Sequence, residues 1–331
     1  MNNLKQLKGI HHVTAITSSA KDIYKFYTNI LGLRLVKKNV NQDDLKTYHL
    51  FFADDRGNPG TDMTFFDFKN ISAHKKGSND ISRTSFRVKN DQALTYWKKR
   101  LKHYNVSHNQ ITEHFGHKVL YFEDFDNQQY ALFSDENNVG VVAGEPWDKG
   151  PVPNEYAILG LGPIFLRVSS KEAIDQALIS VLKMTQSKES DNFILYEMGE
   201  GGNGASVIVE VNKDLPQAYQ GYGGVHHVAF RVKDREHLDA WINHFNDLGL
   251  RSSGFVDRFY FKSVYIRLYP NILFELATDG PGFIDDEEGY ENLGEKLTLP
   301  PHLRHKREYI ESQLPYFDTV RSNKTYDKEY L

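Results

Sequence analysis

The chain has 331 residues and a formal net charge of −4, with 40% hydrophobic and 25% charged residues. These values are ordinary for a globular protein with a core, and the lack of a basic excess argues against a nucleic-acid partner. Because the chain has no cysteine, a disulfide scaffold, a cysteine zinc site and a thiol nucleophile are excluded, so any metal must be held by His, Asp, Glu or Tyr.

The amino-terminal segment MNNLKQLKGIHHVTAIT lacks the apolar run of a signal peptide. No stretch of the chain comes near the roughly 18 consecutive apolar residues that a membrane helix requires. We therefore expect a cytoplasmic protein with no membrane partner and no nucleic-acid partner. A homo-oligomer is compatible with the sequence.

Short motifs recur along the chain and indicate internal repeats. GIHHVT at 9–14 returns as GVHHVA at 224–229. SFRVKN at 85–90 returns as AFRVKD at 229–234, and a fainter copy, FLRVSS, lies at 165–170. The chain therefore contains four copies of one unit, each opening with a short strand.

A helix and further strands follow the opening strand of each copy. The segment 19–32 carries apolar residues at helical spacing and ends on Gly32, and 234–249 does the same and ends on Gly249. Runs rich in β-forming residues, separated by turn residues, come next. The pattern predicts an α+β fold of four tandem βαβββ modules, at about 9–68, 81–135, 158–212 and 222–278.

One glycine-rich motif needs a separate interpretation. GEGGNG at 199–204 matches the dinucleotide-binding fingerprint G-x-G-x-x-G. That fingerprint works only between a strand and a helix, where the helix N-terminus meets a phosphate. Here the motif lies between two strand-like runs, FILYEM and ASVIVEV, so we expect a hairpin loop and no nucleotide cofactor.

The module order resembles that of the vicinal oxygen chelate superfamily, which includes glyoxalases and extradiol dioxygenases, over nearly the whole chain. The resemblance implies that modules pair and that their strands curl into half-barrels around a metal. Length allows two pairs, one per half of the chain. We therefore expect two paired half-barrel domains and a C-terminal arm packed on them, at 1–145, 146–280 and 281–331.

Two histidines and a glutamate emerge when the modules are aligned through their FRV-like strands. His227 of the fourth module aligns with His12 of the first, and the second and third modules have Arg83 and Pro163 at that position. On the last strands, Glu275 lies 48 residues after His227, and Glu210 of the third module lies 47 residues after Pro163. At the matched position the first module has Phe66, and the second has Phe133 or Ser134. The first and fourth modules thus hold a complete ligand set: His12, His227 and Glu275.

Two neutral imidazoles and one carboxylate form the facial triad of non-haem Fe(II) oxygenases, which leaves positions open on the ion. Because side chains alternate along a strand, we expect one ring of each HH pair to point into the cavity. A single histidine in a strand is more often structural, and a buried glutamate more often pairs with arginine. The doubled HH in two copies favours the metal interpretation.

The chain is also similar to two-domain ring-cleaving dioxygenases of the hydroquinone type. The matching motifs are HHVT at 11–14, GVHHVAF at 224–230, DRFYFKSVY at 257–265, FELATDGPGF at 274–283 and LPP at 299–301. This resemblance implies a non-haem Fe(II)-dependent, extradiol-type dioxygenase, with Mn(II) as the alternative metal. Its substrates would be O2 and a small aromatic diol of the hydroquinone or catechol kind.

The same resemblance implies roles for individual residues. It gives the metal ligands as His12, His227 and Glu275, and the catalytic residues as His11, Thr14, His226, Arg258 and Tyr265. Thr14 would donate to a bound oxygen, Arg258 would stabilise anionic oxygen, Tyr265 would orient the substrate and His226 would shuttle a proton. The alternatives without a catalytic role are a solvated hairpin edge for Arg258 and Tyr265. For His11 and His226, the alternative is outward-facing core packing.

An apolar substrate pocket is expected around Phe66 and Phe259, with Phe65 and Phe274 beside them. Two other functions are the alternatives to this reaction. A glyoxalase-type isomerase or lyase generally uses four protein ligands, and Phe66 at the fourth position argues against it. A metal-free sequestering protein of the same fold has no use for the His/His/Glu set. In the incomplete half, we expect Arg83 and Glu210 to form a salt bridge across a second cavity.

Overall fold

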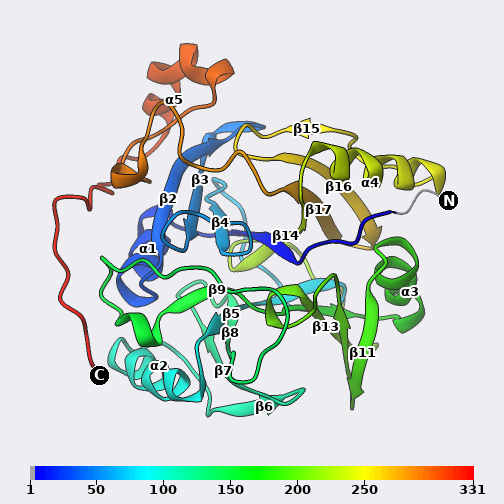
Figure 1. Ribbon diagram of the computed structural model, residues 1–331. Coiled ribbons are helices and arrows are strands. Elements are labelled where there is room, and N and C mark those ends of the chain that lie inside the picture. The colour runs from blue at the N-terminus through cyan, green and yellow to red at the C-terminus, as the bar shows by residue number, and fades with distance from the viewer. Residues whose placement is uncertain (1–3) are drawn as a thin grey trace.

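A computed structural model, which describes residues 4–331, shows four copies of the same unit (Figure 1). Each copy contains a first strand, a helix and three further strands, so the predicted βαβββ order is confirmed. Module 1 comprises β1 (Ile10–Ile16), α1 (Ala20–Lys25), η1 (Phe26–Ile30), β2 (Arg34–Asn41), β3 (Asp44–Ala53) and β4 (Asp62–Phe66). Module 2 comprises β5 (Asp80–Val88), α2 (Asp91–His103), β6 (Thr112–His114), β7 (His117–Glu123) and β8 (Gln129–Ser134).

The second half of the chain repeats this arrangement. A linker holds η2 (Asn154–Tyr156) and β9 (Ile158–Leu161). Module 3 comprises β10 (Ile164–Val168), α3 (Lys171–Asp175), η3 (Gln176–Val181), β11 (Thr185–Ser190), β12 (Phe193–Glu197), η4 (Asn203–Ala205) and β13 (Ser206–Val211). Module 4 comprises β14 (Gly224–Val232), α4 (Arg235–Asp247), β15 (Val256–Asp257), β16 (Lys262–Tyr269) and β17 (Ile272–Thr278). The GEGGNG motif lies in the loop between β12 and β13, as expected.

The four module helices begin in the same way. The residue before each helix has an extended backbone, and its side chain accepts a hydrogen bond from the backbone amide three residues later; these capping residues are Ser19, Asn90, Ser170 and Asp234. Such a cap satisfies one of the free amides of the first turn and typically contributes about 1 kcal/mol. The repeat is therefore visible in local chemistry as well as in topology.

The strands form two curled sheets. One has the order β15-β16-β17-β14-β1-β4-β3-β2, and the other has the order β11-β12-β13-β10-β5-β8-β7-β6, with β9 also paired to β5. In each sheet two modules meet through antiparallel first strands, β1 with β14 and β5 with β10. The expected half-barrels are therefore present.

The modules pair in a different way from the expected one. Module 1 joins module 4, and module 2 joins module 3, so each half-barrel takes strands from both 1–145 and 146–280. The expectation of one half-barrel per half of the sequence is corrected. That expectation rested on chain length alone. Pairing instead depends on which first strands hydrogen-bond to each other, here β1 with β14 and β5 with β10.

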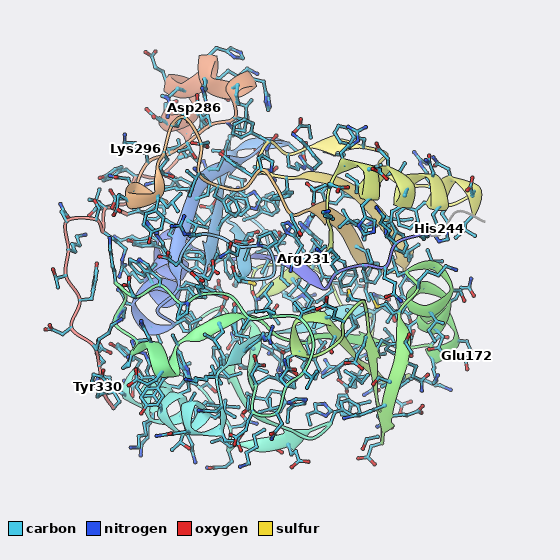
Figure 2. All side chains as sticks on the ribbon, viewed as in Figure 1. Glu172, Arg231, His244, Asp286, Lys296 and Tyr330 are labelled. Carbon is cyan, nitrogen blue, oxygen red and sulfur yellow. The ribbon has the colours of Figure 1, made fainter. Side chains whose placement is uncertain are left out.

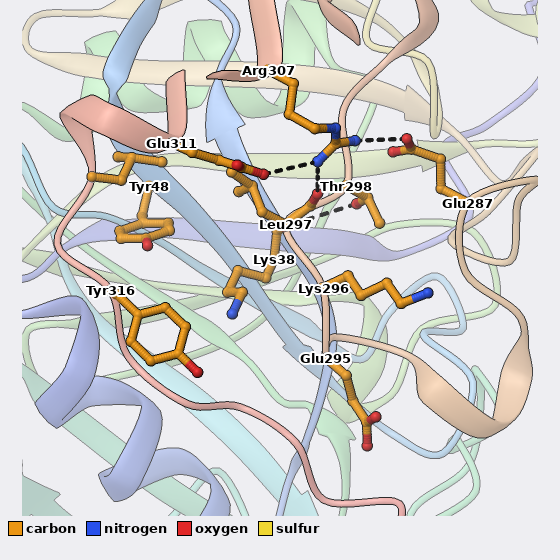
Figure 3. Close-up of a pocket in the computed structure, with 11 residues that line it drawn as sticks. Lys38, Tyr48, Glu287, Glu295, Lys296, Leu297, Thr298, Arg307, Glu311 and Tyr316 are labelled. Carbon is orange, nitrogen blue, oxygen red and sulfur yellow. Dashed lines mark hydrogen bonds and ion pairs between the residues drawn. The ribbon is translucent and has the colours of Figure 1, made fainter. Parts of the chain in front are cut away.

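The segment 281–331 first covers module 1, where Figure 2 labels Asp286 and Lys296, and then runs to α2 of module 2 (Figure 1), where Glu329 contacts Tyr96 and Arg100. It contains η5 (Tyr290–Asn292), η6 (Pro301–Lys306) and α5 (Arg307–Gln313). Its Glu288 accepts from the fully buried Lys37 of β2 at 3.1 Å. A pocket of about 640 Å³ lies between this arm and strands β2 and β3, and Arg307 reaches two arm glutamates beside it (Figure 3).

None of the helices in residues 4–331 has the length and apolar character needed to cross a bilayer.

Candidate active site

Three donor atoms converge where module 1 meets module 4. His12 is on β1, His227 on β14 and Glu275 on β17, three neighbouring strands of one sheet. His12 Nε2 lies 3.2 Å from both His227 Nε2 and Glu275 Oε2, and His227 Nε2 lies 2.9 Å from Glu275 Oε2. All three side chains are buried, Glu275 completely. The sequence therefore identified residues that the fold brings together.

The donor set fits a metal ion. Glu275 Oε2 is buried and has no hydrogen-bond partner within residues 4–331, an arrangement that is costly unless something compensates it. Burial opposes ionisation of Glu275, but His12 and His227 together hold its pKa well below the ordinary value. An anionic oxygen and two imidazole nitrogens pointing at one place are the ligands that divalent transition metals accept.

The orientation of His12 follows from its neighbour His11. His11 Nε2 lies 3.0 Å from the carbonyl oxygen of Thr278, which can only accept, so Nε2 carries the proton. Burial lowers the pKa of His11 to about 3, so its ring is neutral and Nδ1 is an acceptor. His12 Nδ1 therefore donates to it, at 2.9 Å. In its neutral form His12 then presents a lone pair on Nε2, as a metal ligand must.

Both HH pairs lie at β-bulges. The pairing of β1 with β14 shifts register between Ile10 and His12, and again opposite His226, so the first histidine of each pair is left out of the ladder. Bulges re-aim side chains and are common beside active sites. In the second pair both rings line the cavity, with Nδ1 atoms 2.8 Å apart. The expectation that only one ring of each HH pair points into the cavity is therefore wrong for His226 and His227.

The hydrogen-bond register identifies a fourth position around the triad. In module 4, Glu275 lies opposite the residue two places after His227. In module 1, the residue opposite the second place after His12 is Thr64. Thr64, and not Phe66, is therefore the counterpart of Glu275. Counting residues through loops of unequal length placed the match two residues too far along the strand.

Modules 1 and 4 also have equivalent residues that contact Thr64 and Glu275 from the adjacent strand. Ser263 on β16 donates to Glu275 Oε1 at 2.5 Å. His49 on β3 occupies the equivalent place and contacts Thr64 Oγ1 through Nε2 at 2.9 Å. Thr64 Oγ1 also lies 2.8 Å from Thr14 Oγ1. Glu275 and Thr64 are thus each contacted by a polar side chain from the adjacent strand, and Thr14 contacts Thr64.

A cavity of about 420 Å³ opens beside the triad. Arg258 and Tyr265 both line it, and Arg258 Nε donates to Tyr265 Oη at 3.0 Å. Arg258 also pairs with Asp43, on the turn between β2 and β3, at 3.1 Å. Burial raises the pKa of Tyr265, so its hydroxyl keeps its proton. Burial likewise lowers the pKa of His226 to about 3.

The aromatic walls of the cavity differ from the expectation. Phe66 lines it, together with Phe51, Phe68, Tyr260 and Phe261. The assignment of Phe259 to the pocket is corrected, because this residue sits in a turn with φ of 72° and packs outside the cavity lining.

Two further aromatic residues expected near the pocket belong instead to the core. Phe65 and Phe274 are core residues, since alternation turns them to the opposite face of their strands. Phe261 lines the cavity in their place, and its ring centroid lies 5.2 Å from that of His11 and 5.0 Å from that of His12.

His49 is a cavity residue that sequence reasoning missed. It lies on the third strand of module 1, in the run KTYHLFFA, whose alternation places it on the same face as Phe51. A polar residue on the face shared with cavity aromatics was the available signal. A single histidine without a partner in another module gave no reason to choose it.

Within the described part of the chain, the other half-barrel holds no comparable cluster of metal ligands. The expected salt bridge between Arg83 and Glu210 is wrong: within residues 4–331, Glu210 pairs with Arg167, its neighbour across β10 and β13, at 2.8 Å. Arg83 lies over the rings of Tyr121, at 4.2 Å, and Phe165, at 5.3 Å. A guanidinium packed on aromatic faces therefore occupies the place of His227.

The register of this half explains the missing ligands. The residues opposite the second place after Arg83 and Pro163 are Ala131 and Ile208. Glu210 is two residues beyond the position that Glu275 holds in module 4. Ala131 and Ile208, which are apolar, thus occupy the positions that Glu275 and Thr64 hold in the other half-barrel. The aromatic cluster around Phe165 fills the inside of this half-barrel.

Comparison with known proteins agrees with this geometry. Residues 9–141 match the Glyoxalase/Bleomycin resistance protein/Dioxygenase superfamily. A Bacillus subtilis protein provisionally named ring-cleaving dioxygenase MhqA is 42% identical, over 93% of this chain and 98% of its own length. The chlorohydroquinone/hydroquinone 1,2-dioxygenase of Sphingobium indicum is 31% identical over 90% and 93%. A crystal structure of a provisionally named Bacillus subtilis dioxygenase superposes with a TM-score of 0.86 at 32% identity, covering 95% and 98%.

Proposed function

The chain belongs to the Glyoxalase/Bleomycin resistance protein/Dioxygenase superfamily, and on that premise we propose that it is a metal-dependent ring-cleaving dioxygenase that opens a hydroquinone-type diol with O2. The observation that carries the proposal is the convergence of His12, His227 and Glu275 beside a cavity walled by aromatic rings. Largely apolar pockets with a few placed polar groups suit an aromatic ring. The names of the relatives, which include a hydroquinone 1,2-dioxygenase, support the same reaction class.

We propose Fe(II) as the metal, with Mn(II) as the alternative, held by His12, His227 and Glu275. Such an ion supplies Lewis acidity toward a phenolic oxygen and a route for electrons between the ring and dioxygen. Because Thr64 occupies the position where a second carboxylate would be the fourth ligand, the protein offers three strong ligands and leaves room for exogenous ones. Cleavage beside a hydroxyl-bearing carbon, in the extradiol sense, is part of this proposal.

The residues around the cavity have distinct tasks. Arg258 donates to Tyr265 and keeps a positive charge next to it, which favours an anionic oxygen in the cavity. When His227 binds a metal through Nε2, its Nδ1–H donates to His226 Nδ1, so His226 carries its own proton on Nε2. A protonated Nε2 on a neutral, cavity-lining ring can donate a hydrogen bond to a substrate or product oxygen.

Two residues first considered catalytic act through others instead. His11 fixes the tautomer of His12, and Thr14 binds Thr64. We assign both as positioning residues. Ser263 has the same task for Glu275, since its hydroxyl determines which carboxylate oxygen faces the imidazoles.

Anaerobic reconstitution with Fe(II), followed by oxygen uptake on a panel of hydroquinones and catechols, tests the proposal. We expect about one iron per chain and both oxygen atoms of O2 in the ring-opened product, as ¹⁸O2 labelling and mass spectrometry report. If the loaded protein consumes no oxygen with any diphenol but isomerises a thiol–aldehyde adduct, the glyoxalase alternative is correct. If it retains no metal, the sequestering alternative is correct.

A further inference from the structure

The ring of His49 is held in one orientation at the wall of the cavity. Its centroid lies 4.0 Å from that of Phe51 and 4.4 Å from that of Phe66, so two phenyl rings pack against it. Nε2 contacts Thr64 Oγ1 at 2.9 Å. Among the hydrogen bonds formed within residues 4–331, the His49 ring uses only Nε2. The ring is incompletely buried and lines the cavity, which leaves Nδ1 available to a bound molecule.

His49 is also set apart by its place in the pseudo-symmetric arrangement. It is equivalent to Ser263, which uses its hydroxyl to hold Glu275. A serine has one side-chain oxygen, whereas an imidazole has two nitrogens on opposite sides. His49 can therefore support Thr64 with one nitrogen and still offer the other to the cavity. The larger side chain is unnecessary for support alone, since a serine suffices in the other module.

The chemistry of the ring selects the kind of partner. Burial, with the nearby His12 and His227, holds the pKa of His49 well below its ordinary value, so the ring is neutral. A neutral imidazole has one donor and one acceptor nitrogen. A phenol hydroxyl complements Nδ1 in either tautomer, because it can both donate and accept. A ring carboxylate can only accept, so it would match only the tautomer that carries the proton on Nδ1.

We propose that His49 is a substrate-binding residue whose Nδ1 hydrogen-bonds the second hydroxyl of the aromatic diol, the one away from the His12–His227–Glu275 site. This inference rests on the proposed function and narrows its substrate class to diphenols whose second hydroxyl is free. His49 then serves as a specificity residue: it favours a diol over a phenol whose second hydroxyl is replaced by a methyl group.

Anaerobic binding to the Fe(II)-loaded protein tests the inference without turnover. The probes are hydroquinone and 4-methylphenol, and the readout is the ratio of their dissociation constants by calorimetry. One hydrogen bond in such a pocket changes affinity by up to roughly tenfold, so we expect the wild-type protein to prefer hydroquinone by up to that factor. His49→Phe should bring the ratio close to one, while His49→Gln, which keeps a hydrogen-bonding group, should retain part of it.

Thr64→Val is the matched control, because it removes the support of Nε2 and leaves the ring in place between its two phenyl neighbours. It should keep most of the wild-type ratio. A ratio near one in the wild-type protein, or an unchanged ratio in His49→Phe, overturns the inference. These outcomes are independent of oxygen uptake, so failure of the ring-cleavage proposal would be seen separately in the turnover assay.

Discussion

Replacing Ser263 with alanine should weaken metal binding although no ligand is removed. Ser263 is fully buried on β16, and its hydroxyl donates to Glu275 Oε1 at 2.5 Å. The other oxygen of that carboxylate faces His12 and His227. Without the serine hydroxyl, the carboxylate is free to rotate, and Oε1 is left buried without this donor.

The size of the effect follows from the charge on the acceptor. A hydrogen bond to a charged group contributes about 1.5–3 kcal/mol, and about 1.4 kcal/mol corresponds to a tenfold change in affinity. Ser263→Ala should therefore weaken Fe(II) binding roughly ten- to hundredfold. The range agrees with the typical cost, about 10–100-fold, of removing a group that orients a metal ligand.

The dissociation constant for Fe(II) is measurable anaerobically by competition with a chromogenic chelator, and oxygen uptake is then compared at saturating metal. Ser263→Thr keeps the hydroxyl and should bind metal much more tightly than the alanine variant. Ser312→Ala removes an exposed hydroxyl far along the chain and should match the wild type. An affinity of Ser263→Ala within twofold of the wild-type value would refute the reasoning.

Other substitutions test the ligands, the cavity and the arm. His227→Ala should abolish metal retention and activity together, whereas His226→Ala should keep the metal; full metal occupancy in purified His227→Ala would disprove the ligand assignment. Arg258→Ala should lower kcat by roughly 10²-fold or more with unchanged metal content, and an unchanged kcat would remove its charge-stabilising role. Glu288→Gln should lower the free energy of unfolding by about 3 kcal/mol in denaturant titrations, because it strips the fully buried Lys37 of one of its two carboxylates; a loss under 1 kcal/mol would show that the remaining carboxylate suffices.

The repeats and the ligand triad were predictable because they leave local marks in the sequence. Helix periodicity and the recurring FRV core define each module without knowledge of its neighbours. His12 and His227 could be matched since both first strands keep the same HH pair. Glu275 could be found because it is the carboxylate on the last strand of the same module as His227.

Module pairing and exact register were beyond the sequence for physical reasons. Which first strand pairs with which depends on contacts between segments about 200 residues apart, and these have no local signature. Register is decided by backbone hydrogen bonds, so spacing counts misplaced the match by two residues at both Phe66 and Glu210. Bulges at the HH pairs also break the alternation on which strand arguments rely.

The joining of β1 to β14 has a consequence for the order of events during synthesis. β1 ends at Ile16 and its antiparallel partner begins at Gly224, 208 residues later. At a translation rate of about 5–20 residues per second, module 1 waits on the order of 10–40 seconds with an open strand edge. The half-barrel of modules 2 and 3 can close during that interval. The metal-binding half closes last, so a nascent chain stalled before Glu275 cannot yet assemble the set of three ligands, and an unpaired β1 is the edge at which such a chain would aggregate.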